Sequence, residues 1–289
     1  MLTIGFDPEV FSTYTKTKYD YVISPAMLEK LKFISPVIDD IKHPIYIKED
    51  LFSWMGDGVA WELTTYKYFF EPEEIYLFLK ESLNCLEKFL NKIPNIKLYK
   101  KPVVRIDKKL YEPYLEDIKV HMGFIFGCDE DFDAIITNYK AKEFNVENHK
   151  LRYGGGHIHF GDENSENLNY MHYNLIPFVQ LLSIFVGNVN IAESIYPEEE
   201  KLRGFHYGKP GRYRHQSWGI EYRSPSNSWI ENISAIEKIV RGGNLAFEYL
   251  KNPQEGIKIL NKYLTPTIKA IKEVNQDLAK EILYEVNNE

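Results

Sequence analysis

The stretch Gly219-Ile-Glu-Tyr-Arg-Ser-Pro225 has the composition of a short β-strand. Its isoleucine and tyrosine favour β-structure, and its proline ends a hydrogen-bonded ladder. Because side chains alternate between the two faces of a strand, Glu221 and Arg223 share one face. A carboxylate beside a guanidinium can hold a metal ion and an anionic group together, which chemistry on phosphate groups requires. The same pattern also fits an ordinary ion pair on a solvated sheet.

A glycine-rich segment, Tyr153-Gly-Gly-Gly-His-Ile-His-Phe-Gly161, repeats this two-residue spacing with histidines. His157 and His159 share a strand face, and imidazoles at this spacing often bind metal ions. The glycines at 154–156 have no Cβ atom, so the backbone can approach a ligand closely. Two histidines on a half-exposed strand after a glycine-rich turn are the structural alternative.

The segment Gly5-Phe-Asp-Pro-Glu-Val-Phe11 also carries two polar groups at this spacing, Asp7 and Glu9. Pro8 lies between them and cannot donate to a central ladder. We therefore expect the strand at residues 2–11 to lie at an edge, to contain a bulge or to break there. An Asp-Pro turn with an exposed glutamate is the alternative.

A fourth segment, Asp57-Gly-Val-Ala-Trp-Glu-Leu-Thr-Thr65, places Glu62 within a strand of apolar composition. Ala60, Glu62 and Thr64 share one face. A buried charge is costly unless it is paired or bound to metal, so Glu62 is a candidate ligand. The polar side of an ordinary amphipathic strand is the alternative.

The segment from Arg203 to Arg214 concentrates positive charge in an otherwise acidic chain. It is predicted to lie in a long loop at 196–214, and it contains Arg203, Lys209, Arg212 and Arg214 among three glycines. These side chains could neutralise phosphate or a developing acyl phosphate, although a solvated basic loop would have the same composition. No P-loop motif is present.

Composition limits the class of protein. The chain has 289 residues, 44% hydrophobic and 27% charged, and a net charge of −7, so we do not expect non-specific nucleic-acid binding. Cys85 and Cys128 match no metal or redox spacing, and the opening MLTIGF lacks the basic region of a signal peptide, which favours a cytoplasmic protein. The most apolar run, residues 175–189, is interrupted by Pro177 and Gln180; we expect a buried helix and no membrane contact.

Hydrophobic periodicity predicts one domain over residues 1–289, of α+β class, with a mainly antiparallel sheet and helices on one side. The expected helices are residues 25–33, 72–93, 167–189, 229–240, 254–263 and 266–286. The expected strands are residues 2–11, 59–65, 96–99, 103–106, 118–126, 157–160 and 220–223. Residues 34–56 are expected to be loop, and residues 126–133 an acidic turn. Gly242-Gly243 is expected to stop the helix at 229–240.

Taken in order, these segments resemble the glutamine synthetase superfamily of carboxylate–amine ligases, most closely the phage-associated amidoligases of the COOH–NH2 ligase type 2 kind. GFDPEVF (5–11), DGVAWELT (57–64), GGGHIHFG (154–161) and GIEYRSP (219–225) are similar to the site strands of that superfamily. YGKPGRYR (207–214) and FGCD (126–129) are similar to a loop and a turn of the type 2 amidoligases. The similarity runs from Gly5 to about Trp229, and the C-terminal helices at about 254–288 lie outside it.

The resemblance implies a curved, mainly antiparallel sheet that forms a funnel, with helices packed on its outer face. It also implies that ATP and Mg²⁺ or Mn²⁺ bind inside, because mostly oxygen ligands suit these ions. In the family the first histidine binds metal, the second lies near the nucleotide, and the Glu and Arg of the last strand contact metal and phosphate. The expected metal ligands are Asp7, Glu9, Glu62, His157 and Glu221. The expected cofactor contacts are Gly155, Gly156, His159, Arg203 and Lys209, and the expected catalytic residues are Arg212, Arg214 and Arg223.

The implied activity is an ATP-dependent ligase that joins a carboxylate substrate to an amine substrate through an acyl phosphate. Amino acids, peptides, polyamines, a cell-wall peptide and a modified nucleobase all fit as substrates. A phosphotransferase of the same fold, similar to guanidino kinases, is a second interpretation. A metallohydrolase that holds zinc with His157, His159 and an acid is a third. A degenerate nucleotide or peptide binder is the non-enzymatic interpretation.

Overall fold

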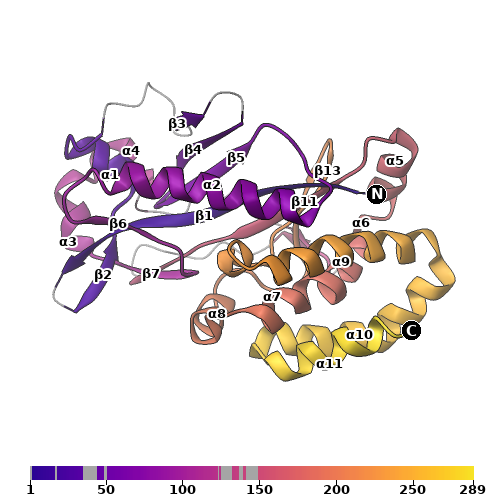
Figure 1. The fold of residues 1–289 in the computed structure, drawn as a ribbon. Helices are drawn as coiled ribbons and strands as arrows, with labels where there is room; N and C mark the ends of the chain where they lie inside the picture. Colours follow the sequence, from indigo (N-terminus) through magenta and orange to yellow (C-terminus); the bar gives the residue numbers. More distant parts are fainter. Residues whose placement is uncertain are drawn as a thin grey trace.

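A computed structural model describes residues 2–16, 18–34, 44–48, 51–122, 124, 132–136, 139–140 and 149–289. This part of the chain combines helices with a mostly antiparallel, open sheet, which confirms the predicted α+β class (Figure 1). The expected turn at 126–129 and Cys128 lie outside the described residues.

Thirteen described strands belong to one sheet. The neighbours run in the order β10-β7-β2-β1-β11-β13-β12-β8-β9; β5 and β6 also pair with β1, and β4 joins β3 to β5. Of the pairs described, β2 with β7 is the parallel one. The strands are β1 (Thr3–Lys16), β2 (Tyr19–Val22), β3 (Pro44–Lys48), β4 (Phe52–Asp57), β5 (Ala60–Thr65), β6 (Ile96–Tyr99), β7 (Val103–Ile106), β8 (Phe132–Asp133), β9 (Tyr139–Lys140), β10 (Leu151–Tyr153), β11 (Gly156–Gly161), β12 (Arg212–Gln216) and β13 (Gly219–Tyr222).

Strand β1 is the longest strand and runs through the predicted break at Pro8. Its ladder to β11 ends at the pair Pro8↔Gly156, and its ladder to β5 begins one residue later at Glu9↔Glu62. Pro8 thus lies where β1 changes partner, which is a position that does not require its missing N–H group. As a result, both acids of this segment lie within one continuous strand.

Most of the helices gather beside one part of the sheet, and three short helices lie at its other end (Figure 1). A π-helical turn, Ser183–Gly187, joins α6 to α7, and short 3₁₀ turns lie at Glu112–Tyr114 and Asn227–Trp229. The α-helices are α1 (Pro25–Lys30), α2 (Pro72–Leu90), α3 (Lys108–Tyr111), α4 (Ile118–Met122), α5 (Ser165–Tyr173), α6 (Leu175–Leu182), α7 (Asn188–Glu193), α8 (Pro197–Gly204), α9 (Ile233–Lys251), α10 (Pro253–Glu273) and α11 (Gln276–Val286).

Aromatic contacts show which face of the sheet the helices cover. The Phe6 ring of β1 lies 5.9 Å from the Phe78 ring of α2, and the Phe160 ring of β11 lies 6.4 Å from the Phe178 ring of α6. On β13, the Tyr222 hydroxyl donates to Ser183 Oγ at 3.3 Å. Because strand side chains alternate, the opposite face of the same three strands carries the polar residues.

The most apolar run of the sequence forms a buried helical segment, as predicted. Leu175–Glu193 is long and apolar enough to span a bilayer, and among the described residues it is the one segment that is. In the structure 78% of its most apolar window is buried inside the protein. It therefore matches the core helix of a soluble protein.

Several predicted elements are wrong because tertiary pairing outweighs local composition. Residues 34–56, expected to be loop, include the strands β3 and β4, which pair with each other and extend the sheet from β5. Residues 118–122, expected to be strand, form the helix α4. The expected loop at 196–214 contains α8 and the start of β12.

Two predicted helix stops are also wrong. Helix α9 continues through Gly242-Gly243. A Cβ atom at Gly242 would lie 2.5 Å from the Phe185 carbonyl oxygen, and one at Gly243 would lie 2.3 Å from the Phe160 ring. These glycines let α9 pack closely against its neighbours. Pro266 lies inside α10, where the carbonyl that loses its partner belongs to the exposed Lys262. The helix ends instead at Val274, which has a φ of 51°.

The close packing of the glycine-rich segment predicts that a side chain at Gly156 lowers the stability of the protein. A Cβ atom there would lie 2.1 Å from the Ser226 carbonyl oxygen. We expect Gly156→Ala to lower the free energy of unfolding by about 1–3 kcal/mol in urea denaturation. The matched control is Gly204→Ala, because nothing lies within 4 Å of its added methyl group. Equal stability of the two variants would contradict this packing.

Candidate functional site

The register of four adjacent strands brings the predicted site residues together on the uncovered face. Asp7 of β1 pairs with His157 of β11, and His159 pairs with Glu221 of β13. Glu221 pairs in turn with Arg214 of β12. Directly opposed side chains of an antiparallel pair lie about 4.5–5.5 Å apart at Cβ, so these four strands assemble one polar patch.

Asp7 contacts both histidines. Its Oδ1 atom lies 3.3 Å from His157 Nδ1 and 3.2 Å from His159 Nε2, and His157 Nδ1 lies 3.5 Å from Glu221 Oε1. We call Asp7, His157, His159 and Glu221 the acid–imidazole cluster. Ligand atoms of Asp7, His159 and Glu221 lie within 4.8 Å of one another, a spacing that a metal ion can bridge. Both imidazoles thus lie beside the Asp7 carboxylate. The expected roles of His157 as metal ligand and His159 as nucleotide contact stay predictions.

Basic side chains surround the Glu221 carboxylate. Arg223 Nη1 donates to Oε1 of Glu221, while Arg214 Nη1 at 3.4 Å and Gln216 Nε2 at 3.1 Å approach Oε2. The His157, Glu221 and Arg223 side chains are at most 2% exposed, whereas those of Asp7 and Arg214 are 20% and 24% exposed. The cluster therefore has a buried floor and a rim that solvent or a ligand can reach.

The charges of the cluster fix its protonation. Burial favours a neutral Asp7, but the charges of His159 and His157 outweigh it and hold the pKa of Asp7 well below its usual value. Burial and the charge of Asp7 act against ionisation of Glu221, but Arg223 and both histidines lower its pKa. Burial opposes the charged form of His159, but Asp7 raises its pKa. The carboxylates are thus ionised at neutral pH.

A second acidic group lies beside the cluster on β1. Glu9 is directly opposite Glu62 of β5, and ligand atoms of Glu9, Asp57 and Glu62 lie within 4.8 Å of one another. We call these three residues the acid trio. Burial and the charge of Asp57 raise the pKa of Glu9, although His157 and a backbone N–H group act in the opposite direction. Three close carboxylates, one of them with a raised pKa, form a site suited to a cation.

The glycine-rich segment supports both groups. Glu9 Oε2 accepts the Gly155 N–H at 2.6 Å, and the Glu9 N–H donates to the Gly155 carbonyl at 2.9 Å. A Cβ atom at Gly155 would lie 2.3 Å from His157 Nε2. Gly156 packs against the backbone of Ser226, so this glycine shapes the strand around the site.

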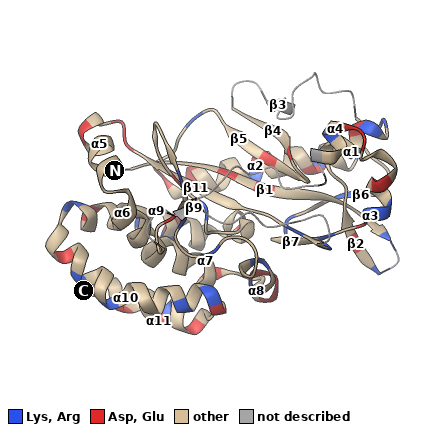
Figure 2. Ribbon diagram, turned by 180° about the vertical axis from the view of Figure 1, so that it is seen from behind, with Lys and Arg blue, Asp and Glu red and all other residues tan. Residues whose placement is uncertain are grey.

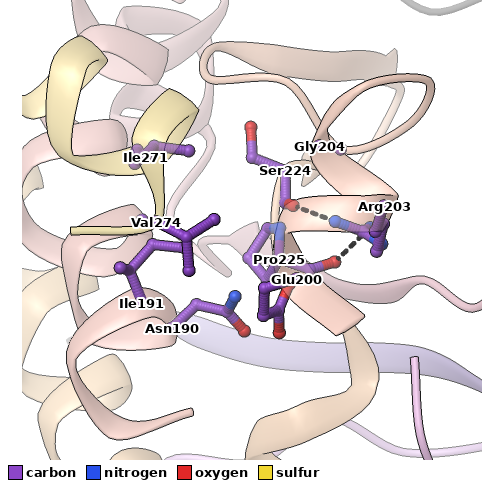
Figure 3. A pocket seen from close by; sticks show the side chains of 11 residues that line it. Asn190, Ile191, Glu200, Arg203, Gly204, Ser224, Pro225, Ile271 and Val274 are labelled. Carbon is purple, nitrogen blue, oxygen red and sulfur yellow. Dashed lines mark hydrogen bonds between the residues drawn. The ribbon is translucent and has the colours of Figure 1, made fainter. Parts of the chain in front are cut away.

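Tyr207 also reaches the cluster. Its hydroxyl lies 3.0 Å from His157 Nε2 and accepts from Arg223 Nη2 at 3.2 Å. Arg203 holds the segment that carries Tyr207, and its side chain is 2% exposed. It donates to the carbonyls of Ser224 and Pro225 (Figure 3) and of Gly154, each at 2.9 Å. Arg203 therefore stabilises the backbone around the site. Its expected contact with phosphate stays a prediction.

Two further predicted residues lie around the patch. Arg212 Nη2 lies 3.7 Å from Asp133 Oδ2, and its buried Nη1 atom makes no hydrogen bond in the described part of the chain. Lys209 is exposed; its backbone carbonyl accepts from Ser224 Oγ at 2.8 Å, which fixes the loop. Within the described residues no ion pair links the Lys209 ammonium to the acid–imidazole cluster.

Comparisons with protein-family models, with curated proteins and with solved structures found no match to this chain. The resemblance to the amidoligases thus remains a prediction from the quoted motifs. What the patch can do chemically follows from its own residues.

Three site residues were not among the sequence-based candidates: Asp57, Tyr207 and Gln216. Asp57 is opposite Ala60 in the β4–β5 hairpin, on the face that carries Glu62. The pair Asp57-Gly58 is a hairpin signal that predicts this placement. Tyr207 lies between α8 and β12, within the predicted loop 196–214, and Gln216 ends β12, a strand that was not predicted.

The raised pKa of Glu9 predicts a pH-dependent stability. Because burial raises this pKa above its ordinary value of 4.5, the protein loses stability as the pH rises from about 4.5 to the folded-state pKa, and the loss is complete above that pKa. We expect Glu9→Gln to raise the melting temperature in EDTA at pH 8, and this gain to shrink as the pH falls toward 4.5. Melting curves across this range measure it. A variant that is less stable at pH 8 by the same margin as at pH 5 would contradict the cause given.

Proposed function

We propose that this protein is an ATP-dependent carboxylate–amine ligase related to the glutamine synthetase superfamily. The observation that carries the proposal is the shared sheet face on which the acid–imidazole cluster, the acid trio, Arg214 and Arg223 converge. Paired cation sites beside buried guanidinium groups are what phosphoryl transfer from ATP needs. We also propose that the sheet forms the funnel of that superfamily, with this face inside.

The donor atoms fit divalent metal ions. Asp7, His159 and Glu221 would hold one ion, and Glu9, Asp57 and Glu62 would hold another, with His157 in reach of the first group. Asp7 Oδ1 and His159 Nε2 are buried and lie 3.2 Å apart, so both atoms could bind the same ion. Five of the six donors are carboxylates, which favours Mg²⁺ or Mn²⁺. Bound ions would neutralise the charge of the phosphates.

The basic residues supply the remaining charge stabilisation. Arg223 is fixed by Glu221 and Tyr207, so its guanidinium is already oriented and needs little reorganisation during the reaction. Arg214 is partly exposed at the rim and can approach a transferring phosphoryl group. Lys209 and Arg212 lie on the adjoining loop and strand, where they can contact the nucleotide.

The proposed reaction has two steps. The carboxylate substrate attacks the γ-phosphate of ATP, and ADP leaves. The amine then attacks the acyl phosphate, a carbon–nitrogen bond forms, phosphate leaves with the bond electrons, and the proton lost by the nitrogen goes to the departing phosphate. Arg223 and Arg214 bind the phosphoryl oxygens in both steps, and the sheet face excludes water beneath His157 and Glu221, whose side chains are at most 2% exposed.

A metallohydrolase is the second candidate, and the acid–imidazole cluster favours it. One imidazole and two carboxylates are a donor set that zinc also accepts, with a position left for water. This function requires neither ATP nor an amine. The basic residues around Glu221 have no role in it, which is why the ligase is the preferred proposal.

The ligase proposal predicts loss of turnover when the sheet face is changed. The wild-type protein is incubated with ATP, Mg²⁺ and a panel of carboxylates and amines, and phosphate and amide are measured. We expect Arg223→Lys and Glu221→Gln to lower kcat by about 100-fold or more, because the transferring charge loses an oriented partner. The matched control is Arg105→Lys, an exposed arginine of β7 whose guanidinium lies over the Tyr19 ring.

Each outcome of this assay separates the candidates. Amide and ADP in equal amounts support the ligase. A stable phosphorylated product without amide supports a phosphotransferase, and hydrolysis without ATP by a zinc-loaded protein supports the metallohydrolase. ATP that neither binds nor turns over with any pair of substrates would refute the proposal.

The two acidic groups predict two bound cations per chain. Titration with Mn²⁺, followed by electron paramagnetic resonance, should give two sites. We expect Glu62→Gln to lower the Mn²⁺ affinity of one site and His159→Ala that of the other. Losing the hydrogen-bond partner of a ligand lowers metal affinity by roughly 10–100-fold, and losing the ligand itself should lower it further. Glu163→Gln, in the turn after β11 and outside both groups, serves as the control. A single site that both variants weaken equally would show that the groups bind one ion.

A further inference from the structure

A cavity lies on the helical side of the molecule, away from the candidate site. It has a volume of about 300 Å³ and is lined by residues of the π-helical turn, α7, α9 and α11. Helix α7 packs against both α9 and α11, so it forms the floor between them (Figure 1). This volume is at the lower end of the range for small-molecule sites, about 300–1,000 Å³.

The floor of the cavity is apolar and well packed. Phe185, Val189 and Ala192 are 1%, 1% and 6% exposed. Leu283 of α11 adds to the apolar wall, and Tyr284, which is 74% exposed, stands at the rim. Such a floor accepts the apolar part of a ligand without leaving polar groups unpaired.

The rim of the same cavity is basic. Lys238 and Arg241 come from α9 and Lys280 from α11. Glu193 is the one acidic residue of the lining, and it is already paired with Lys238. Within the described residues, neither Arg241 nor Lys280 forms an ion pair with a carboxylate. Two cations thus face the cavity without a compensating acid.

This local charge contrasts with the rest of the molecule. The chain has a net charge of −7, and acidic and basic residues are interspersed along α10 and α11 (Figure 2). A cationic rim over an apolar floor is complementary to a ligand that has one anionic end and one apolar end.

We propose that this cavity binds a small amphiphilic anion, such as a medium-chain or aromatic carboxylate. The apolar body lies against Phe185, Val189 and Leu283, and the acidic group lies between Arg241 and Lys280. The site is separate from the proposed ligase centre, because the π-helical turn and α9, which line it, pack against the opposite face of the sheet. Its occupancy can therefore be measured without any enzymatic assay.

The experiment uses a fluorescent aromatic anion, 1-anilinonaphthalene-8-sulfonate, as probe and octanoate as competitor on the full-length protein. We expect one saturable probe site that octanoate displaces. At equal concentration, 1-octanol, octylammonium and inorganic phosphate should displace it at least about tenfold less well, because each lacks one half of the ligand. Displacement by phosphate as strong as that by octanoate, or by octanol alone, would overturn the proposal.

Charge variants locate the site. Arg241→Glu and Lys280→Glu should each weaken octanoate binding by about tenfold or more. The matched control is Lys272→Glu, the same charge change at an exposed position of α10 that does not line the cavity. Melting curves establish that each variant is folded. Octanoate binding that is unchanged in both rim variants would refute the site. An octanoate affinity that falls as the protein concentration rises would also refute it, because a second copy of the chain would then occupy the cavity.

Discussion

The register between β1, β11 and β13 is the constraint on which the rest of the structure depends. A slip of one residue would move every polar side chain of these strands to the face that the helices cover. The other face prevents the slip, since Phe6, Phe160 and Tyr222 are held by aromatic rings and a hydroxyl of the helical layer. The apolar core thus places Asp7 opposite His157, and His159 opposite Glu221.

How much the sequence could predict follows from the range of each interaction. Two-residue spacing is local, so the shared face of His157 with His159, and of Glu221 with Arg223, was predictable from alternation alone. Which strands pair is not local, and no spacing in the sequence indicates that Glu9 meets Glu62. The shared face of Asp57 and Glu62 has a local signal in Asp57-Gly58, but that Glu9 joins them depends on the pairing of β5 with β1.

The failed helix predictions have the same origin. Glycine and proline lower helix stability by about 1 and 3 kcal/mol, which makes Gly242-Gly243 and Pro266 reasonable stops in isolation. In the folded chain the glycines allow α9 to approach Phe160 and Phe185, and this close packing outweighs the low helix propensity of glycine. The proline loses little, because the carbonyl left without a partner belongs to an exposed residue. The helix propensity of single residues therefore predicts helix ends poorly where tertiary packing is close.

The two polar groups of the sheet face differ in how their charge is balanced, and this difference bears on their roles. Around Glu221, arginine and histidine side chains already compensate the carboxylates and lower their pKa values. The acid trio has a buried glutamate with a raised pKa, so it is the group that a cation would relieve most. In the proposed ligase, a cation bound at the trio would offset the burial of the Glu9 carboxylate. In the same proposal, the arginine-rich side would be where an anionic substrate group meets positive charge.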